Sequence, residues 1–249
     1  MILEFLLVVF LLGVILAFFY KQAVAEFRIL QTESLEKALP VLHERCPVIV
    51  TPVPMPQDLW TQKDIQQRPT LAGKGVNGVT LRDAIKQDTF LLKPSTAELL
   101  ATEIGLPVWV QKTILPLWKE SQWWTRILSP RVEVAIGAQG LRPTFAYTTI
   151  VMCTEGALQV SLLNESSDAY LPKKWLGKRL SKLTRDEAPL LGNIQYIDVI
   201  VRPGTALVLP PHWKVCWENT ETPTPALAVW IELHHPMSRL MRNSFYRGS

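Results

Sequence analysis

Seven short runs of apolar and β-branched residues follow one another from residue 132 onward, and they constrain the fold more than any other feature. Turn-forming residues separate each run from the next, which is typical of β-strands. A series of short strands of this kind predicts a sandwich or a barrel, with helical segments placed ahead of it. The runs are Val132–Ile136, Tyr147–Cys153, Leu158–Leu163, Tyr196–Val201, Ala206–Leu209, Lys214–Glu218 and Ala226–Leu233.

The composition is that of one such domain with an additional segment. The 249 residues exceed the length of an ordinary domain, which is about 100–200 residues. Nineteen prolines, 12 glycines and nine tryptophans indicate short elements that are joined by rigid turns and packed around large aromatic side chains. Cys46, Cys153 and Cys216 form no C-x-x-C arrangement for zinc or redox chemistry, and three thiols cannot all pair, so we expect them to be reduced and mostly buried.

The segments ahead of the strands have mixed patterns. Residues 23–45 keep a helical spacing of apolar residues, with Pro40 as an expected interruption. Cys46–Val53 is β-branched and predicts a strand, whereas Ser95 resembles a capped helix start. Pro107–Ser121 predicts a further helix that is broken near Pro116.

The N-terminal segment predicts a membrane anchor. Phe5–Tyr20 carries no charge, and at a rise of ~1.5 Å per residue the residues around it extend the helix across ~30 Å of hydrocarbon. Lys21 and Arg28 follow the segment, so the rule for flanking positive charge places the C-terminal domain in the cytoplasm. We therefore expect a single-pass membrane protein that contacts the membrane through residues 2–20. Residues 1–30 form the anchor and stalk, and residues 31–249 form the β domain.

A cleaved secretory signal is the alternative for the same segment. Ala23-Val24-Ala25 has the small-x-small form of a cleavage site. The first residues contain no Lys or Arg, however, and the apolar run is at the long limit for a signal. The sequence therefore favours the retained anchor.

One segment resembles a known family. Tyr196–Glu218 has the pattern of a strand, a Pro-Gly turn, a strand that ends in proline, and a Pro-x-Trp before another strand, and this resembles the late strands of the cupin-like JmjC domain. Ile150–Tyr170 and Cys46–Val53 resemble earlier parts of the same domain. The resemblance implies a mainly β fold, a double-stranded β-helix of the cupin or jelly-roll type with flanking helices. The residues of the late motif, which we expect at the barrel mouth, are Pro203, Gly204, Pro210, Pro211 and Trp213.

Active members of that family bind Fe(II) through a His-x-Asp/Glu pair and a later His, which leave open positions for 2-oxoglutarate and oxygen. Counted from Gly156 and Trp213, the resemblance places these ligands at Pro143, Phe145 and Val215, whose side chains cannot bind a metal. The cation that would pair with the co-substrate is matched by Leu158. The chain contains no His-x-Asp/Glu in any register, so the resemblance predicts a pseudo-enzyme without metal or cofactor.

The remaining histidines leave an enzyme as the competing hypothesis. An oxygenase with rearranged ligands needs His212, His234 or His235 to meet a carboxylate such as Glu218 or Glu232. Surface or turn histidines are the simpler expectation, because none of the four, which include His43, has a recognised ligand spacing.

A basic segment with interleaved leucines lies between residues 173 and 185. As a helix it would have a basic face for anionic lipid, where each basic residue near the surface adds ~1 kcal/mol. Equally, it can be a solvated connection whose leucines pack on the sheet. The net charge of +4 is mild, so we expect no nucleic-acid partner. The basic residues are Lys173, Lys174, Lys178, Arg179, Lys182 and Arg185.

These observations predict a membrane-anchored, catalytically inactive cupin/JmjC-like domain that acts as an interaction or structural module with a protein partner that the sequence does not identify. The competing hypotheses are a 2-oxoglutarate-type oxygenase with non-standard ligands and a structural membrane protein of a larger assembly.

Overall fold

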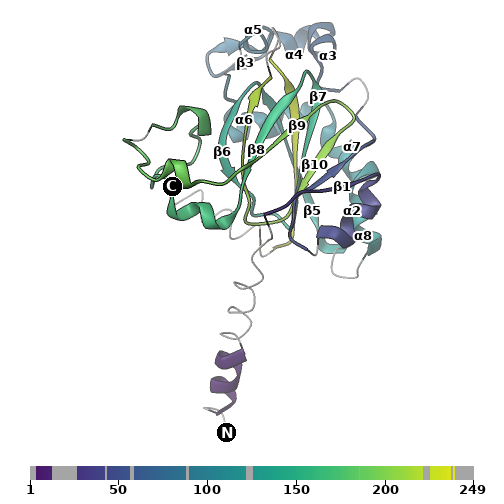
Figure 1. The fold of residues 1–249 in the computed structure, drawn as a ribbon. Helices are drawn as coiled ribbons and strands as arrows, with labels where there is room; N and C mark the ends of the chain where they lie inside the picture. The colour runs from purple at the N-terminus through teal and green to yellow at the C-terminus, as the bar shows by residue number, and fades with distance from the viewer. Residues whose placement is uncertain are drawn as a thin grey trace.

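A computed structural model describes residues 4–12, 27–42, 44–56, 59–87, 90–121, 126–184, 186–220, 225–236 and 238. Two β-sheets face each other at its centre, and most of the helices lie along one of them (Figure 1). The larger sheet has six strands and the smaller sheet has four.

The larger sheet contains, in spatial order, β1 (Leu30–Thr32), β2 (Val48–Val50), β10 (Ala206–Leu209), β7 (Thr148–Glu155), β12 (Leu227–His234) and β5 (Ser129–Ile136). The smaller sheet contains β6 (Gln139–Pro143), β11 (Lys214–Asn219), β8 (Leu158–Leu163) and β9 (Ile197–Val201). From β5 to β12 the chain crosses from one sheet to the other at every step except the β8–β9 hairpin, and all pairs are antiparallel, which makes a double-stranded β-helix. The predicted double-stranded β-helix with flanking helices is therefore confirmed, whereas the transmembrane helix of the same prediction is not found among the described residues.

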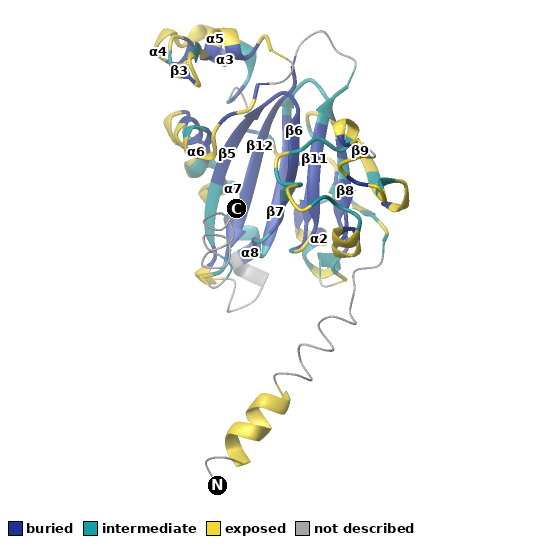
Figure 2. Cartoon of the chain, turned by 90° about the vertical axis from the view of Figure 1, so that its left-hand side faces the viewer, coloured by how far each residue is buried: buried dark blue, intermediate teal, exposed yellow. Residues whose placement is uncertain are grey.

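Alternation along the strands divides the apolar residues between two cores. On β12, Val229 and Ile231 pack against the helices, whereas Ala228 and Trp230 face the smaller sheet. The space between the sheets is filled by apolar side chains from both, among them Trp217, which stacks on Trp230 with ring centroids 5.8 Å apart. The interior is therefore a packed core along most of its length, and Figure 2 shows most of the surrounding strand residues as buried.

The outer face of the larger sheet is covered by short helices. The helix α6 begins with Pro94 in its first turn and Lys93 as its N-cap, so the prediction of a cap at Ser95 is wrong. Pro40 lies inside α2 and does not interrupt it. The helices are α2 (Leu35–Leu42), α3 (Gln62–Gln67), α4 (Pro69–Ala72), α5 (Leu81–Ala84), α6 (Pro94–Glu103), α7 (Leu106–Thr113) and α8 (Leu115–Ser121), and a small hairpin of β3 (Gly75–Val76) and β4 (Val79–Thr80) precedes α5.

The long connection between β8 and β9 covers part of the outer face of the smaller sheet. It contains the 3-10 helices η2 (Glu165–Ala169), η3 (Leu180–Lys182) and η4 (Leu191–Asn193). Gly177 donates its N–H to the carbonyl of Leu141, and a Cβ on Gly140 would lie 2.0 Å from the carbonyl oxygen of Gly177. Glycine at position 140 therefore allows the connection to pair with the edge strand β6.

The predicted membrane-spanning helix lies only partly within the described residues. Residues 4–12 are helical and their apolar side chains are exposed, for example Phe10 at 70% (Figure 2). Residues 13–26, which complete the predicted span, lie outside the described part of the chain. No helix within the described part has the length and apolar character that crossing a bilayer requires. Phe27 and Ile29 already pack against the barrel interior.

All seven strands predicted from residue 132 onward are present, and the strand predicted at Cys46–Val53 is present as β2, with bounds that differ by up to three residues. The sequence did not predict β6, whose residues Gln-Gly-Leu-Arg-Pro lack the β-branched and aromatic side chains that favour strands. A strand of this composition is tolerated because β6 lies at the edge of its sheet and ends in Pro143.

Candidate functional site

The candidate site is the end of the barrel where β6 ends and β11 begins, which we call the barrel end. On the larger sheet, Leu209, Thr149, Glu232 and Arg131 lie side by side on four neighbouring strands. Directly opposite residues point to the same face of a sheet, and positions two apart share that face. Because Trp230, two residues before Glu232, faces the interior, the whole row faces the interior.

A buried group of charges occupies one side of the barrel end. Glu133 is 1% exposed, and its two carboxylate oxygens accept from different guanidinium groups. Arg142 Nη2 lies 2.7 Å from Glu133 Oε2, and Arg131 Nη2 lies 3.0 Å from Oε1. Arg131 also contacts Glu98 of α6 at 2.9 Å. Charge-assisted bonds at both oxygens stabilise a carboxylate that burial would otherwise destabilise.

Arg142 joins the two sheets. It belongs to the smaller sheet, and its guanidinium reaches Glu133 on the larger one. Its guanidinium carbon also lies 4.6 Å from the ring centroid of Trp230, a cation–π distance. The cation is therefore held by a carboxylate and an aromatic face together.

A second carboxylate lies beside this group. Glu232 Oε2 is 2.9 Å from His234 Nε2, and both residues are almost fully buried. Burial raises the pKa of the Glu232 carboxyl, but the hydrogen bond to His234 and the charge of Arg142 outweigh burial, and the pKa lies below its ordinary value. Glu232 is therefore ionised at neutral pH and complements the nearby guanidinium.

The other side of the barrel end is apolar. Val215 on β11 pairs with Leu162 on β8, and both are fully buried in the interior. Trp213 stacks on Phe27, with ring centroids 6.3 Å apart, and its indole N–H donates to the carbonyl of Arg45. These side chains close the interior beside the charged group.

Only one of the three predicted ligand positions faces the interior. Val215 does, and the residue opposite it on β6 is Arg142. Pro143 pairs with Lys214, whose ammonium group bonds to Asp168 on the outside of the barrel, so Pro143 faces outward. Phe145 lies beyond the strand and is half-buried. The inward positions are thus one residue earlier than predicted, because a slip of one residue reverses every side chain of a strand.

The first inward position is Arg142, and the second, two residues later, is Thr144. The hydroxyl of Thr144 accepts from the backbone N–H of Trp213 at 3.0 Å and donates to the carbonyl of Pro210 at 2.9 Å. It anchors the turn that precedes β11 and has no hydrogen left to donate. Neither position offers the imidazole and carboxylate of an iron site.

Leu158 lies far from these positions. It is buried in the interior, but it pairs with Asn219, whereas Val215 pairs with Leu162. Four residues along a strand correspond to about 13 Å. The predicted co-substrate position is therefore at the opposite end of the barrel, and the residue of β8 at the barrel end is Leu162.

The predicted mouth motif is divided between the two ends. Pro203 and Gly204 form the turn from β9 to β10 at the end occupied by Leu158, with Gly204 at φ +87°. Pro210, Pro211 and Trp213 lie at the barrel end, because β10 runs the length of the barrel between the two groups. Only the second group borders the candidate site.

The histidines differ in whether they lie near a carboxylate. His234 meets Glu232, as the alternative with rearranged ligands requires. Glu218 lies on the outer face of the smaller sheet and accepts from Ser181, and His212 is an exposed residue in the turn before β11. His43 lies outside the described residues.

The polar groups at the barrel end are engaged with one another. Within the described ranges, no group of three or more His, Cys, Asp or Glu residues is arranged to hold a metal ion. Both oxygens of Glu133 accept from guanidinium groups, and Glu232 and His234 supply two metal-binding side chains that contact each other.

The basic segment is not a helix. It consists of turns and the short η3, and Leu180 and Leu183 pack against the outer face of the smaller sheet with Trp175. Lys173 and Lys174 are exposed, and Lys178 pairs with Glu187 at 2.5 Å. Arg185 lies outside the described residues. The predicted basic face is thus absent, and the leucines pack as the alternative expects.

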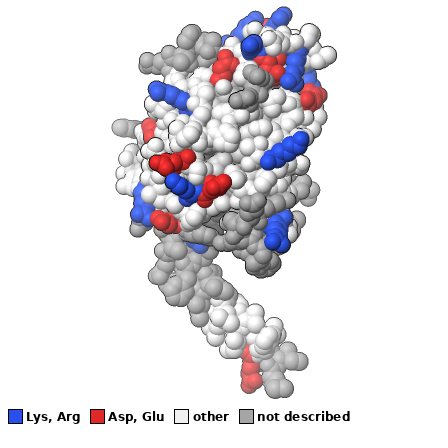
Figure 3. Space-filling model, turned by 90° about the vertical axis from the view of Figure 1, so that its right-hand side faces the viewer, with Lys and Arg blue, Asp and Glu red and all other residues white. Residues whose placement is uncertain are grey.

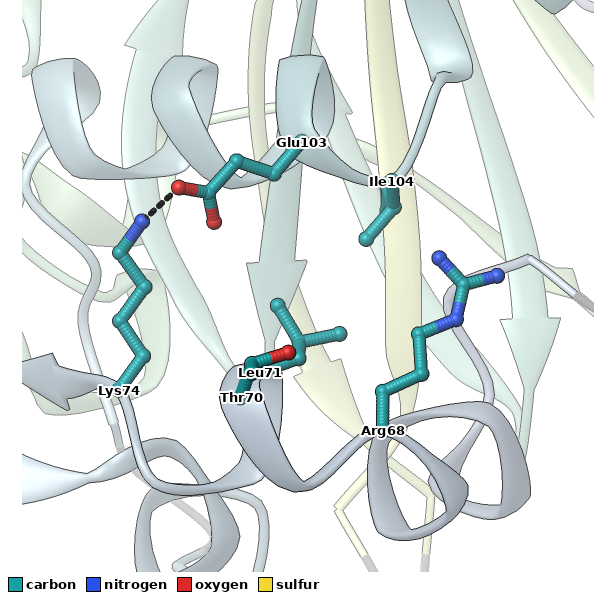
Figure 4. Close-up of a pocket in the computed structure, with 6 residues that line it drawn as sticks. All are labelled: Arg68, Thr70, Leu71, Lys74, Glu103 and Ile104. Carbon is teal, nitrogen blue, oxygen red and sulfur yellow. Dashed lines mark hydrogen bonds and ion pairs between the residues drawn. The ribbon is translucent and has the colours of Figure 1, made fainter.

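A cavity of about 460 Å³ lies between α4 and α6 (Figure 4). Two cations line it, but Lys74 bonds to Glu103, and Arg68 pairs with Asp64 at 2.9 Å. Because both charges are neutralised, this cavity is a weak site for an anion.

The strand order defines the fold class. The order β10-β7-β12-β5 faces the order β6-β11-β8-β9, and apart from the hairpin of β8 and β9 consecutive strands lie in opposite sheets. The domain is cupin-like.

No model of a known protein family matches the sequence, and no curated protein matches it. Among solved structures, the chain is similar to YcfD of Escherichia coli, at 13% identity and a TM-score of 0.47 over 84% of this chain and 56% of that one. A second YcfD structure, described as a ribosomal oxygenase, has 15% identity and a TM-score of 0.31 over 53% of this chain and 30% of that one. Hydroquinone 1,2-dioxygenase from Sphingomonas sp. TTNP3 has 18% identity and a TM-score of 0.30 over 42% and 59%. The chain thus matches about a third to three fifths of the length of these proteins.

Proposed function

We propose that this chain is a catalytically inactive, cupin/JmjC-like module that is anchored in a membrane and serves in protein interaction or in the structure of an assembly. The observation that carries the proposal is the position of Arg142, whose guanidinium takes the inward position at the end of β6 and is held by Glu133. Arginine is a permanent cation without a lone pair for a metal.

The residues at the inward positions support the loss of iron chemistry. Arg142 and Arg131 are cations that supply no metal ligand, and the carboxylate of Glu133 between them accepts from both guanidinium groups. Val215 and Leu162 add only carbon on the facing strands.

The N-terminal segment supports the membrane attachment. Phe5, Phe10 and the other apolar side chains of residues 4–12 are about half exposed or more, and the sequence stays apolar up to Tyr20. A helix that is apolar all round requires an apolar environment. Lys21 and Arg28 then favour a cytoplasmic domain. The exposed Lys173 and Lys174 are candidates for contact with anionic lipid.

Anaerobic titration of the full-length protein with Fe(II), followed by gel filtration and metal analysis, tests the proposal. We expect no stoichiometric iron in the protein fraction. One iron per chain that survives gel filtration would overturn it.

The competing candidate is an oxygenase with rearranged ligands, and the inward-facing pair of Glu232 and His234 favours it. In that case His234→Ala would abolish iron binding, whereas His212→Ala, an exposed position, would not. If the chain is inactive, neither substitution changes the metal content.

A further inference from the structure

A cavity of about 500 Å³ lies on the outer face of the smaller sheet, away from the barrel interior. Its floor is formed by side chains of β8, β9 and β11, and its walls come from the connection between β8 and β9. The walls include the side chains of Leu180, Leu191, Ile194 and Tyr196, beside Ser181 and Gly192. We call it the minor-sheet pocket.

Two carboxylates line the minor-sheet pocket. Asp198 on β9 accepts from Ser161 Oγ at 2.6 Å and from Gln159 Nε2 at 3.2 Å, and both donors are on β8. Glu218 on β11 accepts from the hydroxyl of Ser181. The three donors are neutral, and neither carboxylate has an ion-pair partner among the described residues. Both negative charges therefore remain uncompensated there.

The sheet geometry places the two charges on opposite sides of the pocket. Strands β9 and β11 flank β8, so Asp198 and Glu218 belong to strands about 10 Å apart. A carboxylate can accept about four hydrogen bonds. Asp198 uses two and Glu218 uses one, so each keeps acceptor capacity. The basic residues Arg179 and Lys182, which flank the wall residues Leu180 and Ser181, do not line the pocket.

We propose that the minor-sheet pocket binds an organic cation, an ammonium or guanidinium group carried on an apolar body. The carboxylates would accept from the cationic head, and the leucine, isoleucine and tyrosine side chains would cover the apolar part. Pockets of 300–1,000 Å³ that combine apolar walls with a few polar groups are typical of sites for small ligands. The same chemistry is offered by a free amine and by a Lys or Arg side chain next to an apolar residue in a partner polypeptide.

The edge of the smaller sheet offers a route for the polypeptide. β9 is the last strand of that sheet, and Tyr196 and Ile200 beside the pocket are 50% and 53% exposed. An extended segment that paired with β9 would carry alternate side chains over Asp198. The pocket lies outside the barrel, so this proposal and the proposed loss of iron chemistry stand or fall separately.

Calorimetric titration of the full-length protein with 2-phenylethylamine, with the neutral 2-phenylethanol and with a short peptide of alternating Arg and Leu tests the proposal. We expect the cationic probes to bind, the alcohol not to bind, and added salt to weaken binding. Tighter binding of the peptide would identify a polypeptide as the source of the cation, and tighter binding of the amine would identify a free ligand.

Asp198→Asn and Glu218→Gln keep the side-chain shape and remove one charge each. We expect each to weaken binding roughly tenfold or more, the effect of losing a charge-assisted hydrogen bond. Glu36→Gln, at an exposed position on α2, is the matched control and should leave affinity unchanged. Equal binding of the amine and the alcohol, no binding of any probe, or unchanged affinity in both pocket variants would overturn the proposal.

Discussion

Arg142 on β6 and Glu133 on β5 bond to each other at 2.7 Å across the interior of the barrel end, one from each sheet. Removing one partner of a buried ion pair leaves an uncompensated charge. We therefore expect Arg142→Met to lower the free energy of unfolding by about 3 kcal/mol. Urea denaturation measures the change. Arg82→Met, at an exposed position, should change it by less than about 0.5 kcal/mol, and an equally small effect of Arg142→Met would show that the pair does not join the sheets.

Ionisation of Glu232 makes the free energy of unfolding depend on pH in the acid range. Its pKa is lower in the folded protein than in the unfolded chain, so the folded state favours the ionised form. This contribution is fully present above the ordinary pKa of a carboxyl group and is lost as pH falls through the lowered value. Glu232→Gln should flatten that part of the pH–stability curve measured by thermal unfolding, while Glu36→Gln should leave it as it is. A curve for Glu232→Gln that matches the parent would contradict the assignment.

The three cysteines should be unreactive in the folded protein. All three are free and buried, and burial raises the pKa of Cys153 and of Cys216 to about 12. Because the thiolate is the nucleophile, we expect almost no alkylation at pH 8 until the protein is unfolded. Mass spectrometry after a timed iodoacetamide pulse counts the modified thiols. Fast modification of Cys153 or Cys216 without denaturant would mean that the inner strands β7 or β11 become exposed readily in the folded protein.

The strands of the barrel could be predicted because their apolar side chains are continuous or alternate, as in Leu158–Leu163 and Leu227–His234. β6 could not, since its edge position permits Gly140 and Pro143. Because the sequence did not predict β6, it did not determine which residues at the C-terminal end of this strand face the interior, and the predicted positions were one residue too late. That single residue separates an apolar Pro143 from a charged Arg142 at the ligand position.

The charged group at the barrel end could not be predicted from the sequence either. Arg131, Glu133, Arg142 and Glu232 lie on three strands, and only the pairing of β5 with β12 and the reach of β6 bring them together. The sequence nevertheless contained an indication, because Glu133 and Glu232 interrupt the apolar runs of β5 and β12. Charged residues at inward positions of a buried strand indicate partners elsewhere in the fold.

Substitution of the N-terminal apolar segment tests the membrane attachment. Val8→Asp with Leu12→Asp places two charges in the middle of the predicted span, and each costs about 2.5–3.5 kcal/mol at the centre of a bilayer. We expect the protein to lose its association with vesicles in a flotation experiment. Glu4→Gln should float as the parent does, and unchanged flotation of the double variant would remove the basis for an anchor.

Substitution in the basic segment tests the contact with anionic lipid. Lys173→Glu with Lys174→Glu should weaken binding to vesicles that contain phosphatidylserine and leave binding to neutral vesicles unchanged, because each basic residue near the surface contributes ~1 kcal/mol. Sedimentation with the two vesicle types measures the difference. On the face shown in Figure 3, basic and acidic side chains are interspersed, so we expect no comparable effect from single substitutions there. An equal loss on both vesicle types would assign the effect to something other than charge.

The turnover of 2-oxoglutarate tests the central claim most directly. Full-length protein, supplied with Fe(II), ascorbate, oxygen and 2-oxoglutarate, is assayed for release of carbon dioxide from the co-substrate. We predict that carbon dioxide is released no faster than in a sample without protein, because Arg142 and Val215 take the inward positions where iron ligands would be needed. Decarboxylation that depends on the protein and is abolished by His234→Ala would contradict the account.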